Sequence, residues 1–500
     1  MLPLAARDAV SHGARMKHFL ALAALALPFP ALAQGLADSD RTALLGHVAA
    51  FQPQMDKAAL DIWKLAEVGY METKSSTILQ AQLKAAGFTI EAGIAGMPTA
   101  FVARFRQGSG PVIGVLAEYD ALPGMAQAAV PRREAIAGLK AGHACGHNLF
   151  GAASVAAAIA VKQWMVANKV GGELRVYGSP AEEGGSGKVF LVRAGLTKDV
   201  DSMLHWHAAD RNSAAQGGAL ANSSGKFRFT GVAAHAAAAP DRGRSALDAV
   251  EAMNVMVNMM REHVPQETRI HYIITDGGKA PNVVPETAEV YYYVRHPDQA
   301  AVKSIMARVK QAADGAALGT GTKVAFQQIG GTFDLLPNDT LGRVMYENLK
   351  RVGGVQWSAE DRAFAAAITP TLPEAREAPP SVDTVLPYEQ TKEGMGSTDV
   401  GDVSYTTPTA GMVAAAWVPG TPAHSWQAVA ADGTGVGLKG AAVAAKTLAL
   451  TAAELFRSPA TVTAAKAELE KRRGADFVYQ PLLGDIAPAL DYRKSVMGGD

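Results

Sequence analysis

The chain is poor in cysteine and carries no excess charge. Cys145 is the only cysteine among 500 residues, so no disulfide can form within the chain. Basic and acidic residues number 47 each, so the sequence has neither a basic field nor an acidic tail, and we expect no nucleic-acid partner. With 48% hydrophobic and 19% charged residues, the composition is typical of a folded globular protein. The length allows about two to four domain-sized units.

Several sequence motifs of common enzyme classes are also missing. The chain contains no H-E-x-x-H and no G-x-S-x-G, and Gly187-Lys188 lacks the spacing of a phosphate-binding loop. Gly435-Val-Gly-Leu-Lys-Gly440 matches G-x-G-x-x-G, but no strand precedes it and no acidic partner follows. We therefore interpret it as the opening of a helix over 441–455 and not as a dinucleotide site.

The N-terminal residues have the three parts of a secretory signal. Met16-Lys-His is basic, Phe19 to Leu27 is apolar, and Ala31-Leu-Ala33 is a cleavage pattern. We predict a signal peptide over 1–33, with Met16 as a second possible start; a buried N-terminal helix is the alternative. The apolar run is too short to span a membrane, and we predict no later membrane span. The mature protein is expected to be exported, either periplasmic or secreted.

Strands that end in polar loops alternate with helical sequence before residue 210. Strands are predicted over 112–117, 173–177 and 203–207, and the alanine-rich stretch 152–166 predicts a helix. This alternation predicts an α/β fold with a mixed, mostly parallel sheet flanked by helices. Ligands of such sheets bind beyond the carboxyl ends of the strands, where the polar residues of this chain fall.

A second α/β unit interrupts this pattern. Its predicted elements are strands over 226–230, 270–275 and 288–294, and helices over 245–260 and 300–313. They predict a small two-layer domain over 224–332, inserted into a larger domain that it divides into 34–223 and 333–500. The segment 369–392, rich in Pro, Glu and Thr, is predicted to be a long loop or flap.

Cys145 has histidines two residues away on both sides, His143 and His147. A thiolate beside imidazoles suggests a divalent metal site, most naturally for zinc. The alternative is a buried, inert thiol. Glu182-Glu183 follows a predicted strand and precedes Gly184-Gly-Ser-Gly187, a bare and flexible stretch. One of these carboxylates can bind metal while the other takes a proton from water.

Three further histidines add to this set. His205 and His207 lie two apart on a predicted strand, and His207 is the better candidate ligand because it is nearer the carboxyl end; His205 is expected to pack behind it. His424 lies in the loop Pro419-Gly-Thr-Pro-Ala-His-Ser-Trp426. A single histidine is more often structural, but together these residues can fill one or two metal coordination shells.

Taken in order, the motifs resemble the M20 metallopeptidase/amidohydrolase family, and within it the group of B-type subunits of aminobenzoyl-glutamate hydrolase. The resemblance extends over nearly the whole mature chain. The matching stretches are Gly142-His-Ala-Cys-Gly-His-Asn148, Pro180-Ala-Glu-Glu-Gly-Gly185, Leu204-His-Trp-His207, Ala234-His-Ala-Ala-Ala-Ala-Pro-Asp241, Gly278-Lys-Ala-Pro-Asn-Val-Val-Pro285, Ser397-Thr-Asp-Val-Gly-Asp402 and Pro422-Ala-His-Ser-Trp426.

The resemblance implies a role for each candidate residue at the metal centre. Glu182 matches the general base that activates water, and Asp120 resembles an aspartate that orients a ligand. Glu118 stands near the place where many relatives have a metal-binding histidine. The positions that match ligands of two divalent ions, zinc or manganese, are Cys145, His147, Glu183, His207 and His424.

The inserted unit carries the remaining matches. The resemblance implies that this unit is a lid or dimerisation domain, and that 34–223 and 333–500 together form a catalytic domain. His235 resembles a histidine that reaches the active site of the partner protomer and stabilises the oxyanion, which requires a dimer. Asn282 and Arg295 resemble groups that hold a substrate carboxylate, since guanidinium binds carboxylate bidentately; a turn residue and a surface ion pair are the alternatives. The resemblance also leaves open a related second subunit.

The sequence thus predicts a metal-dependent amidohydrolase that cleaves the amide of an N-acyl or N-aroyl amino acid such as aminobenzoyl-glutamate, a small molecule with a carboxylate. A dipeptidase or carboxypeptidase on the same scaffold is one alternative. A non-catalytic protein that binds a metal or ligand is the other.

Overall fold

The computed structural model describes residues 35–374, 379–389, 396–494 and 497. The predicted signal peptide, 1–33, lies outside these residues, as does part of the predicted loop over 369–392. The described part of that loop contains one short helical turn, Thr369–Thr371, and otherwise irregular backbone.

The larger sheet has six strands in the order β1-β2-β6-β3-β7-β12. Strands β6, β3, β7 and β12 pair in parallel, whereas β1 and β2 add antiparallel pairs at one edge. The predicted mixed sheet flanked by helices is therefore confirmed. The strands are β1 Thr89–Ala92, β2 Phe101–Gln107, β3 Val112–Ala117, β6 Gly172–Gly178, β7 Ser202–Ala209 and β12 Thr409–Ala415.

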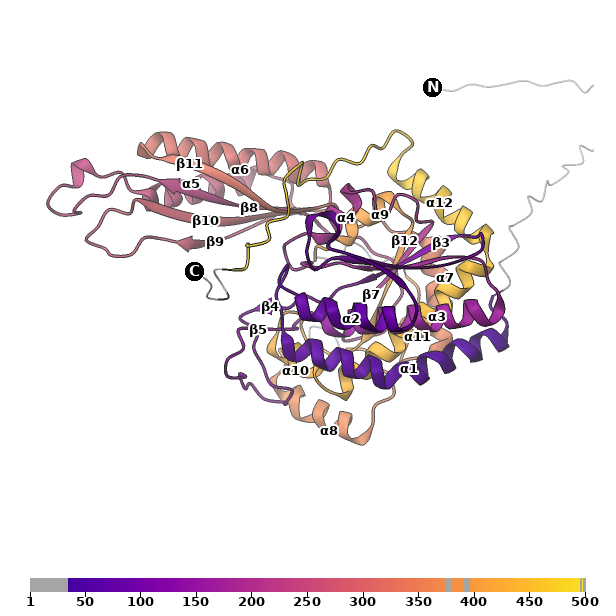
Figure 1. Cartoon of the computed structure of the whole chain (residues 1–500). Helices are drawn as coiled ribbons and strands as arrows, with labels where there is room; N and C mark the ends of the chain where they lie inside the picture. The colour runs from indigo at the N-terminus through magenta and orange to yellow at the C-terminus, as the bar shows by residue number, and fades with distance from the viewer. Residues whose placement is uncertain (1–34, 375–378, 390–395, 495–496, 498–500) are drawn as a thin grey trace, which may run out of the picture. The chain divides into compact units, whose positions relative to one another are not determined.

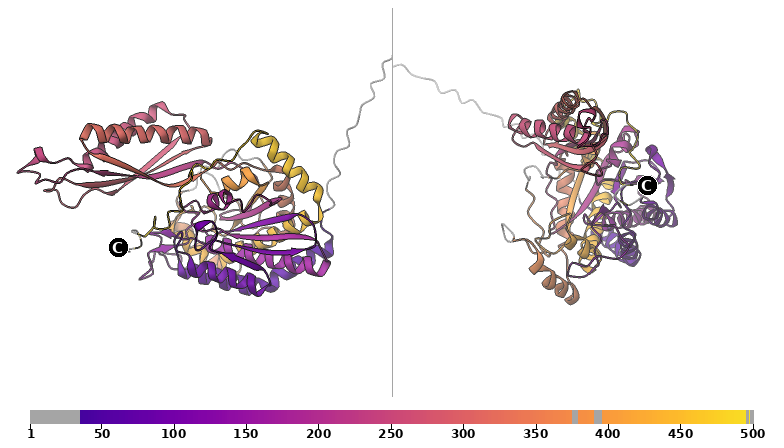
Figure 2. Two further views of the ribbon diagram at one scale, coloured as in Figure 1. Left: turned by 45° about the horizontal axis from the view of Figure 1, so that its top comes forward. Right: turned by 90° about the vertical axis from the view of Figure 1, so that its left-hand side faces the viewer.

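Helices cover this sheet. Strands β3 and β6 are buried at every residue, which explains why 112–117 is an unbroken apolar run without alternation. The long helices α1 (Asp38–Leu65), α3 (His147–Asn168) and α11 (Gly435–Arg457) pack on one another, and α3 and α11 contact the central strands (Figures 1 and 2). Helix α11 begins at Gly435, so the G-x-G-x-x-G match lies inside a helix.

By length and composition alone, α3 and α11 are apolar enough to cross a membrane, but 83% of each apolar window is buried inside the fold. Core helices of folded proteins have the same property. The expectation of no membrane span stays a prediction.

The smaller sheet has four antiparallel strands in the order β11-β8-β10-β9. Helices α5 (Ala246–Met260) and α6 (Gln299–Thr320) lie on one of its faces and share a separate hydrophobic core with it (Figure 1). Ser245 caps α5 as its sequence suggests, by accepting a hydrogen bond from the Asp248 amide. We call this unit the lid; its boundaries as a domain stay a prediction. Its strands are β8 Ala221–Thr230, β9 Arg269–Asp276, β10 Thr287–His296 and β11 Lys323–Thr332.

The remaining elements are shorter and connect these layers. They are α2 Thr73–Ala85, α4 Gly187–Arg193, α7 Asp339–Val352, α8 Ala359–Ile368, α9 Val400–Thr406, α10 Trp426–Asp432, α12 Pro459–Arg473, β4 Leu122–Pro123 and β5 Ala141–Gly142.

Candidate active site

Three neighbouring strands of the large sheet deliver polar side chains to the same edge. Asp120 follows the carboxyl end of β3, Glu182 and Glu183 follow β6, and His207 is near the end of β7. Because these strands run parallel, their carboxyl ends meet, and loops from elsewhere in the chain add Cys145 and other groups.

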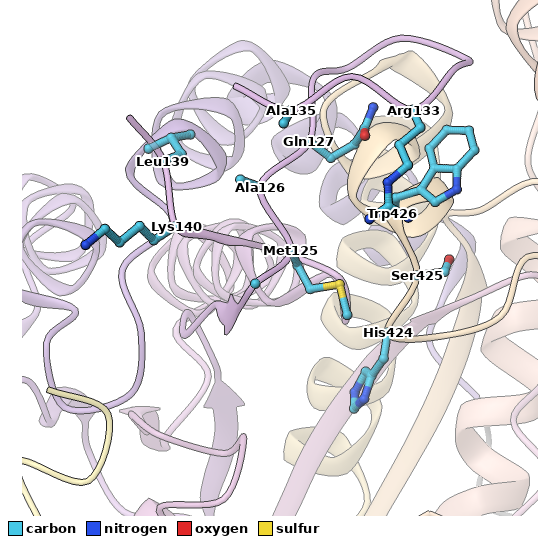
Figure 3. Close-up of a pocket in the computed structure, with 11 residues that line it drawn as sticks. Met125, Ala126, Gln127, Arg133, Ala135, Leu139, Lys140, His424, Ser425 and Trp426 are labelled. Carbon is cyan, nitrogen blue, oxygen red and sulfur yellow. The ribbon is translucent and has the colours of Figure 1, made fainter. Parts of the chain in front are cut away.

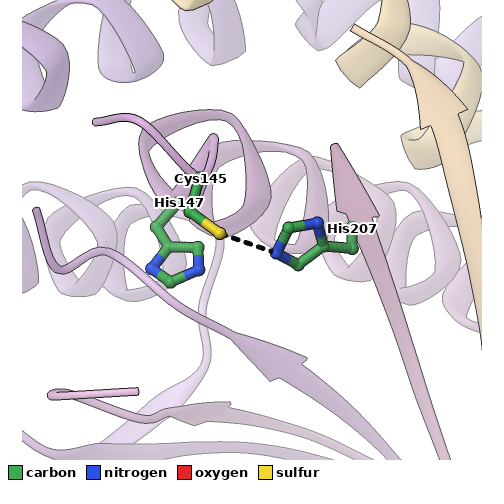
Figure 4. A group of neighbouring side chains, drawn as sticks. All are labelled: Cys145, His147 and His207. Atoms are coloured by element: carbon green, nitrogen blue, oxygen red, sulfur yellow. Dashed lines mark hydrogen bonds between the residues drawn. The ribbon is translucent and has the colours of Figure 1, made fainter. Parts of the chain in front are cut away.

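Cys145, His147 and His207 form the first cluster of donor atoms (Figure 4). The Cys145 Sγ lies 3.3 Å from Nε2 of His207, and the candidate ligand atoms of all three lie within 4.8 Å of one another. Nδ1 of His207 is 2.7 Å from the Ala208 carbonyl, to which it donates, so its Nε2 lone pair faces the sulfur. Gly146 permits this approach, since a Cβ there would lie 2.4 Å from that of Ala208.

Asp120 positions two members of the site. Its Oδ1 accepts from Nδ1 of His147 at 2.8 Å, and its Oδ2 accepts from the Glu183 amide at 2.9 Å. This leaves Nε2 of His147 as the free ligand atom, buried and without a hydrogen-bond partner among the described residues, with Oε2 of Glu118 at 3.1 Å. The arrangement agrees with the role that the sequence resemblance implies for Asp120.

His424 brings a second cluster together on the other side of Cys145. Its Nε2 lies 3.2 Å from Oε1 of Glu183, and these two residues and Cys145 again place their ligand atoms within 4.8 Å. The His424 backbone has φ +57, an uncommon conformation for a residue with a side chain, and its amide donates to the Ala144 carbonyl at 2.9 Å. The loop is thereby fastened beside the cysteine.

The donor set fits divalent metal ions. Nε2 of His147 and Oε1 of Glu183 are buried and form no hydrogen bond of good geometry among the described residues, although Glu118 and His424 lie within ion-pair distance of them, and burial of such polar atoms carries a desolvation cost. Burial, followed by the nearby Glu183 carboxylate, raises the pKa of the Cys145 thiol well above its usual value. A cation would offset both costs, and the mixture of thiolate, imidazole and carboxylate is typical of zinc and similar metals.

Glu182 is close to these donors and faces a cavity of about 670 Å³. Its carboxylate lies within 4.8 Å of the ligand atoms of His147 and Glu183. Burial, and then the Glu118 and Glu183 carboxylates, raise the pKa of Glu182 well above its usual value. A carboxyl group whose proton affinity is raised at a cavity wall is suited to accept a proton from water.

Contacts anchor the loop that carries Glu182 and Glu183. Ala181 has φ +57, and its amide donates to the buried Glu72 carboxylate at 2.9 Å; burial raises the pKa of Glu72 to about 8. The expected flexibility of the glycine stretch stays a prediction. A Cβ on Gly187 would lie 1.9 Å from the Pro180 carbonyl oxygen, so the absence of a side chain permits close packing.

More distant parts of the chain hold the same loop. The Tyr70 hydroxyl donates to the Gly185 carbonyl at 2.6 Å. The Glu183 carbonyl accepts from the Tyr492 hydroxyl at 3.1 Å and from the Arg493 guanidinium at 2.6 Å. Sequence reasoning missed these residues because none of them lies in a motif.

A fully buried lysine was also missed. Nζ of Lys188 lies 2.7 Å from Oε1 of Glu118 and 2.6 Å from Oδ1 of Asp399, which lines the cavity. The only sequence signal for this lysine was the Gly187-Lys188 pair, which lacks the spacing of a phosphate-binding loop. Glu118 is thus an ion-pair partner of Lys188 in this chain.

The structure separates the predicted lid residues into two groups. Arg295 lines the cavity with Glu182, whereas His235 and Asn282 are both exposed and do not line it. His235 forms an isolated bridge with Val283, and the Ala236 amide donates to the Asn282 carbonyl, so these two residues lie on neighbouring segments of the lid.

His205 packs as expected, because a Cβ on Gly411 of β12 would lie 2.3 Å from its ring. A second cavity, of about 430 Å³, adjoins the site and shares His424 with it (Figure 3). Met125, Arg133 and Trp426 are among the other residues that line this second cavity.

Comparison with known proteins adds family relationships to this geometry. The peptidase dimerisation domain family matches residues 221–320, which fall in the lid. The chain is 39% identical over 455 residues to the B-type p-aminobenzoyl-glutamate hydrolase subunit of Escherichia coli K12, covering 86% of this chain and 94% of that protein. It is 29% identical over 424 residues to the Xaa-Arg dipeptidase of Mus musculus, covering 82% and 87%.

Solved structures show the same fold. An aminobenzoyl-glutamate utilization protein from Klebsiella pneumoniae superposes with a TM-score of 0.58 at 19% identity, covering 82% of this chain and 97% of that one. The YXEP protein of Bacillus subtilis is described as a dinuclear metal binding peptidase from the M20 family. It superposes with a TM-score of 0.51 at 17% identity, covering 81% of this chain and 98% of that one.

The fold, the matched dimerisation domain and the relatives identify a hydrolase. The chain belongs to the M20 family of peptidases and amidohydrolases.

Proposed function

We propose that this hydrolase is an exported, metal-dependent amidohydrolase that cleaves the amide bond of N-acyl or N-aroyl amino acids, with p-aminobenzoyl-glutamate as the leading substrate. The observation that carries the proposal is the clustering of Cys145, His147, Glu183, His207 and His424, with Glu182 beside them; all of these except the buried His147 line one cavity. The name of the 39% identical relative supports the choice of substrate.

The five clustered residues would hold two divalent ions, zinc or manganese. Bound divalent cations acidify water and polarise a carbonyl group. Glu182 takes one proton from the attacking water and delivers it to the amide nitrogen as the carbon–nitrogen bond breaks, which leaves a carboxylate and a free amine. Positioned proton transfer of this kind is typically worth about 10²–10⁴-fold in rate.

The proposal includes a homodimer formed through the lid. Of the twelve large hydrophobic side chains that are exposed among the described residues, eight are on the lid, and such surfaces mark interaction sites. The eight are Val232, Val255, Met256, Met259, Ile273, Ile274, Val283 and Leu318. His235 and Asn282 are exposed on neighbouring segments of the same unit, so a partner protomer can receive them. The A-type p-aminobenzoyl-glutamate hydrolase subunit of Escherichia coli K12 matches at 25% identity, which keeps a related second protein in view as a partner.

The central test is Glu182→Gln, which keeps the shape of the side chain and removes its basicity. We expect turnover of p-aminobenzoyl-glutamate to fall by at least about 10²-fold while metal content, measured by mass spectrometry, stays at the wild-type level. Near-normal turnover with full metal content would refute the assignment of Glu182 as the base.

The substrate class is tested separately on the wild-type protein with zinc or manganese added. The panel contains aroyl-glutamates, acyl-amino acids and dipeptides, including Xaa-Arg dipeptides because of the second relative. Preferred cleavage of dipeptides would replace the proposal with a dipeptidase. Bound metal without cleavage of any member would argue against the whole proposed reaction.

A further inference from the structure

The lid end of the substrate cavity is built from polar side chains that lack partners. Arg295, Asn222 and Thr332 are aligned across the three adjacent strands β10, β8 and β11, and all three line the cavity. Nε of Arg295, Oδ1 of Asn222 and Oγ1 of Thr332 are buried and have no hydrogen-bond partner among the described residues. Aligned polar groups of this kind, left unpaired by the protein, indicate a place for a polar ligand group.

A second guanidinium reaches the same cavity from a distant part of the sequence. Residues 474–494 follow α12, and Figure 1 shows this yellow segment running toward the base of the lid sheet. Its Leu482 packs against the lid core, and its Arg493 lines the cavity that contains Glu182 and Arg295. No sequence motif surrounds Arg493.

Contacts hold Arg493 in place but use only a small part of its hydrogen-bonding capacity. One N–H donates to the Glu183 carbonyl, and the guanidinium lies 4.9 Å from the centre of the Tyr492 ring. A guanidinium has five N–H donors. Tyr293 stands between the two cations: Arg295 lies 5.6 Å from the centre of its ring, and a Cβ on Gly184 would meet both its hydroxyl and Arg493.

Among the residues that the structure describes, neither guanidinium has a carboxylate partner within ion-pair distance, although Glu182 and Glu183 line the same cavity. The Asp399 carboxylate of the cavity wall is paired with Lys188. Two cations in a partly buried site are stabilised by two anionic groups, whereas one carboxylate would leave a positive charge without a partner.

We propose that Arg493 acts with Arg295 as a pair of cationic groups that selects a leaving amino acid with two carboxylates, such as glutamate or aspartate. The proposal rests on the amidohydrolase function given above and narrows its substrate class. Arg493 is a specificity-determining residue in this scheme, and the side chain of a leaving arginine would be repelled by the same pair.

The test compares N-benzoyl-glutamate with N-benzoyl-glutamine, which differ by one carboxylate at nearly equal size. Wild-type enzyme should prefer the glutamate compound. For Arg493→Gln we expect kcat/KM on the glutamate compound to fall about 10- to 100-fold, mainly through KM, as charge-assisted hydrogen bonds are lost. The loss on the glutamine compound should be much smaller, so the preference disappears, and Arg493→Lys should keep part of it. Lys494→Gln is the matched control, because Lys494 is adjacent and exposed and does not line this cavity.

Other outcomes separate the possible failures. Equal losses on both compounds, carried by kcat and accompanied by loss of metal, would show that Arg493 only positions Glu183 through its carbonyl, and would overturn the proposal. The proposal would also be overturned if the wild-type enzyme cleaved both compounds equally well, and this measurement needs no variant. If the wild-type enzyme with metal cleaves neither these compounds nor any other acyl-amino acid, the proposed function itself fails.

Discussion

Asp120 and His147 are joined by a hydrogen bond of 2.8 Å between Oδ1 and Nδ1, and both side chains are fully buried. The same carboxylate accepts the Glu183 amide through its other oxygen. One aspartate therefore sets the orientation of two candidate ligands, one at the start of α3 and one after β6. Replacing Asp120 should therefore weaken metal binding without removing any ligand atom.

For Asp120→Asn we expect metal affinity to fall about 10- to 100-fold. The amide of asparagine is uncharged and has only one acceptor oxygen, so it cannot accept hydrogen bonds from both His147 and the Glu183 amide at separate oxygens, as Asp120 does. Isothermal titration calorimetry of the apoprotein with metal measures this affinity directly. Asp314→Asn, on the exposed face of α6, is the control and should bind metal as the wild type does. Wild-type affinity in Asp120→Asn would remove Asp120 from the positioning role.

Cys145→Ser tests whether the only cysteine is a ligand or a packed thiol. A hydroxyl is a poor replacement for a thiolate at zinc, so metal occupancy should drop first, with a smaller effect on the stability of the apoprotein. Occupancy by mass spectrometry and thermal unfolding with and without a chelator separate the two effects. If the apoprotein is strongly destabilised and occupancy is unchanged, the thiol is a packing residue.

Mixing two inactive variants tests whether His235 acts across a dimer. In the proposed mechanism His235→Ala would lack the oxyanion donor, and Glu182→Gln would lack the base. In a mixed dimer, the site with an intact Glu182 receives His235 from the Glu182→Gln protomer. An equal mixture that has exchanged protomers should therefore regain about one quarter of wild-type turnover. If the mixture stays as inactive as its components, His235 does not act in trans.

The proposed dimer surface is tested by placing a charge on it. Ile273 of β9 is 62% exposed on the lid, and Ile273→Arg should weaken self-association by at least about tenfold, because an interface would bury an unpaired cation. Sedimentation velocity over a range of concentrations measures the change. Val166→Arg on α3, at a position 51% exposed and away from the lid, should leave association unchanged. Equal effects of both variants would place the interface elsewhere.

Local chemistry made much of the fold and site predictable. The apolar run 112–117 was assigned correctly because a strand buried on both faces leaves an unbroken apolar pattern. The helix over 152–166 was assigned from its alanine content, and the strand with His207 was also assigned correctly. The ligand candidates were found because each lies at the end of an element, in a short polar stretch. The antiparallel edge β1-β2 carried no such pattern, and sequence reasoning did not predict it.

What the sequence did not reveal depends on contacts between distant segments. Lys188 is separated by 211 residues from Asp399, and Arg493 by 310 from Glu183. Periodicity and spacing report on neighbours along the chain, so they carry no signal for such pairs. The close packing of Gly185 and Gly187 against Ala181 and Pro180 was also invisible in the sequence, because it depends on the folded loop.

The Glu183 carbonyl is held by Tyr492 and Arg493, which a ribosome adds more than three hundred residues after Glu183 itself. Domains generally fold from the N-terminal side during synthesis. The large sheet can therefore begin to form long before its catalytic loop is fastened. On the proposal that this protein is exported, the chain would begin its passage with an incomplete active centre, and hydrolysis would begin only after the whole chain has folded.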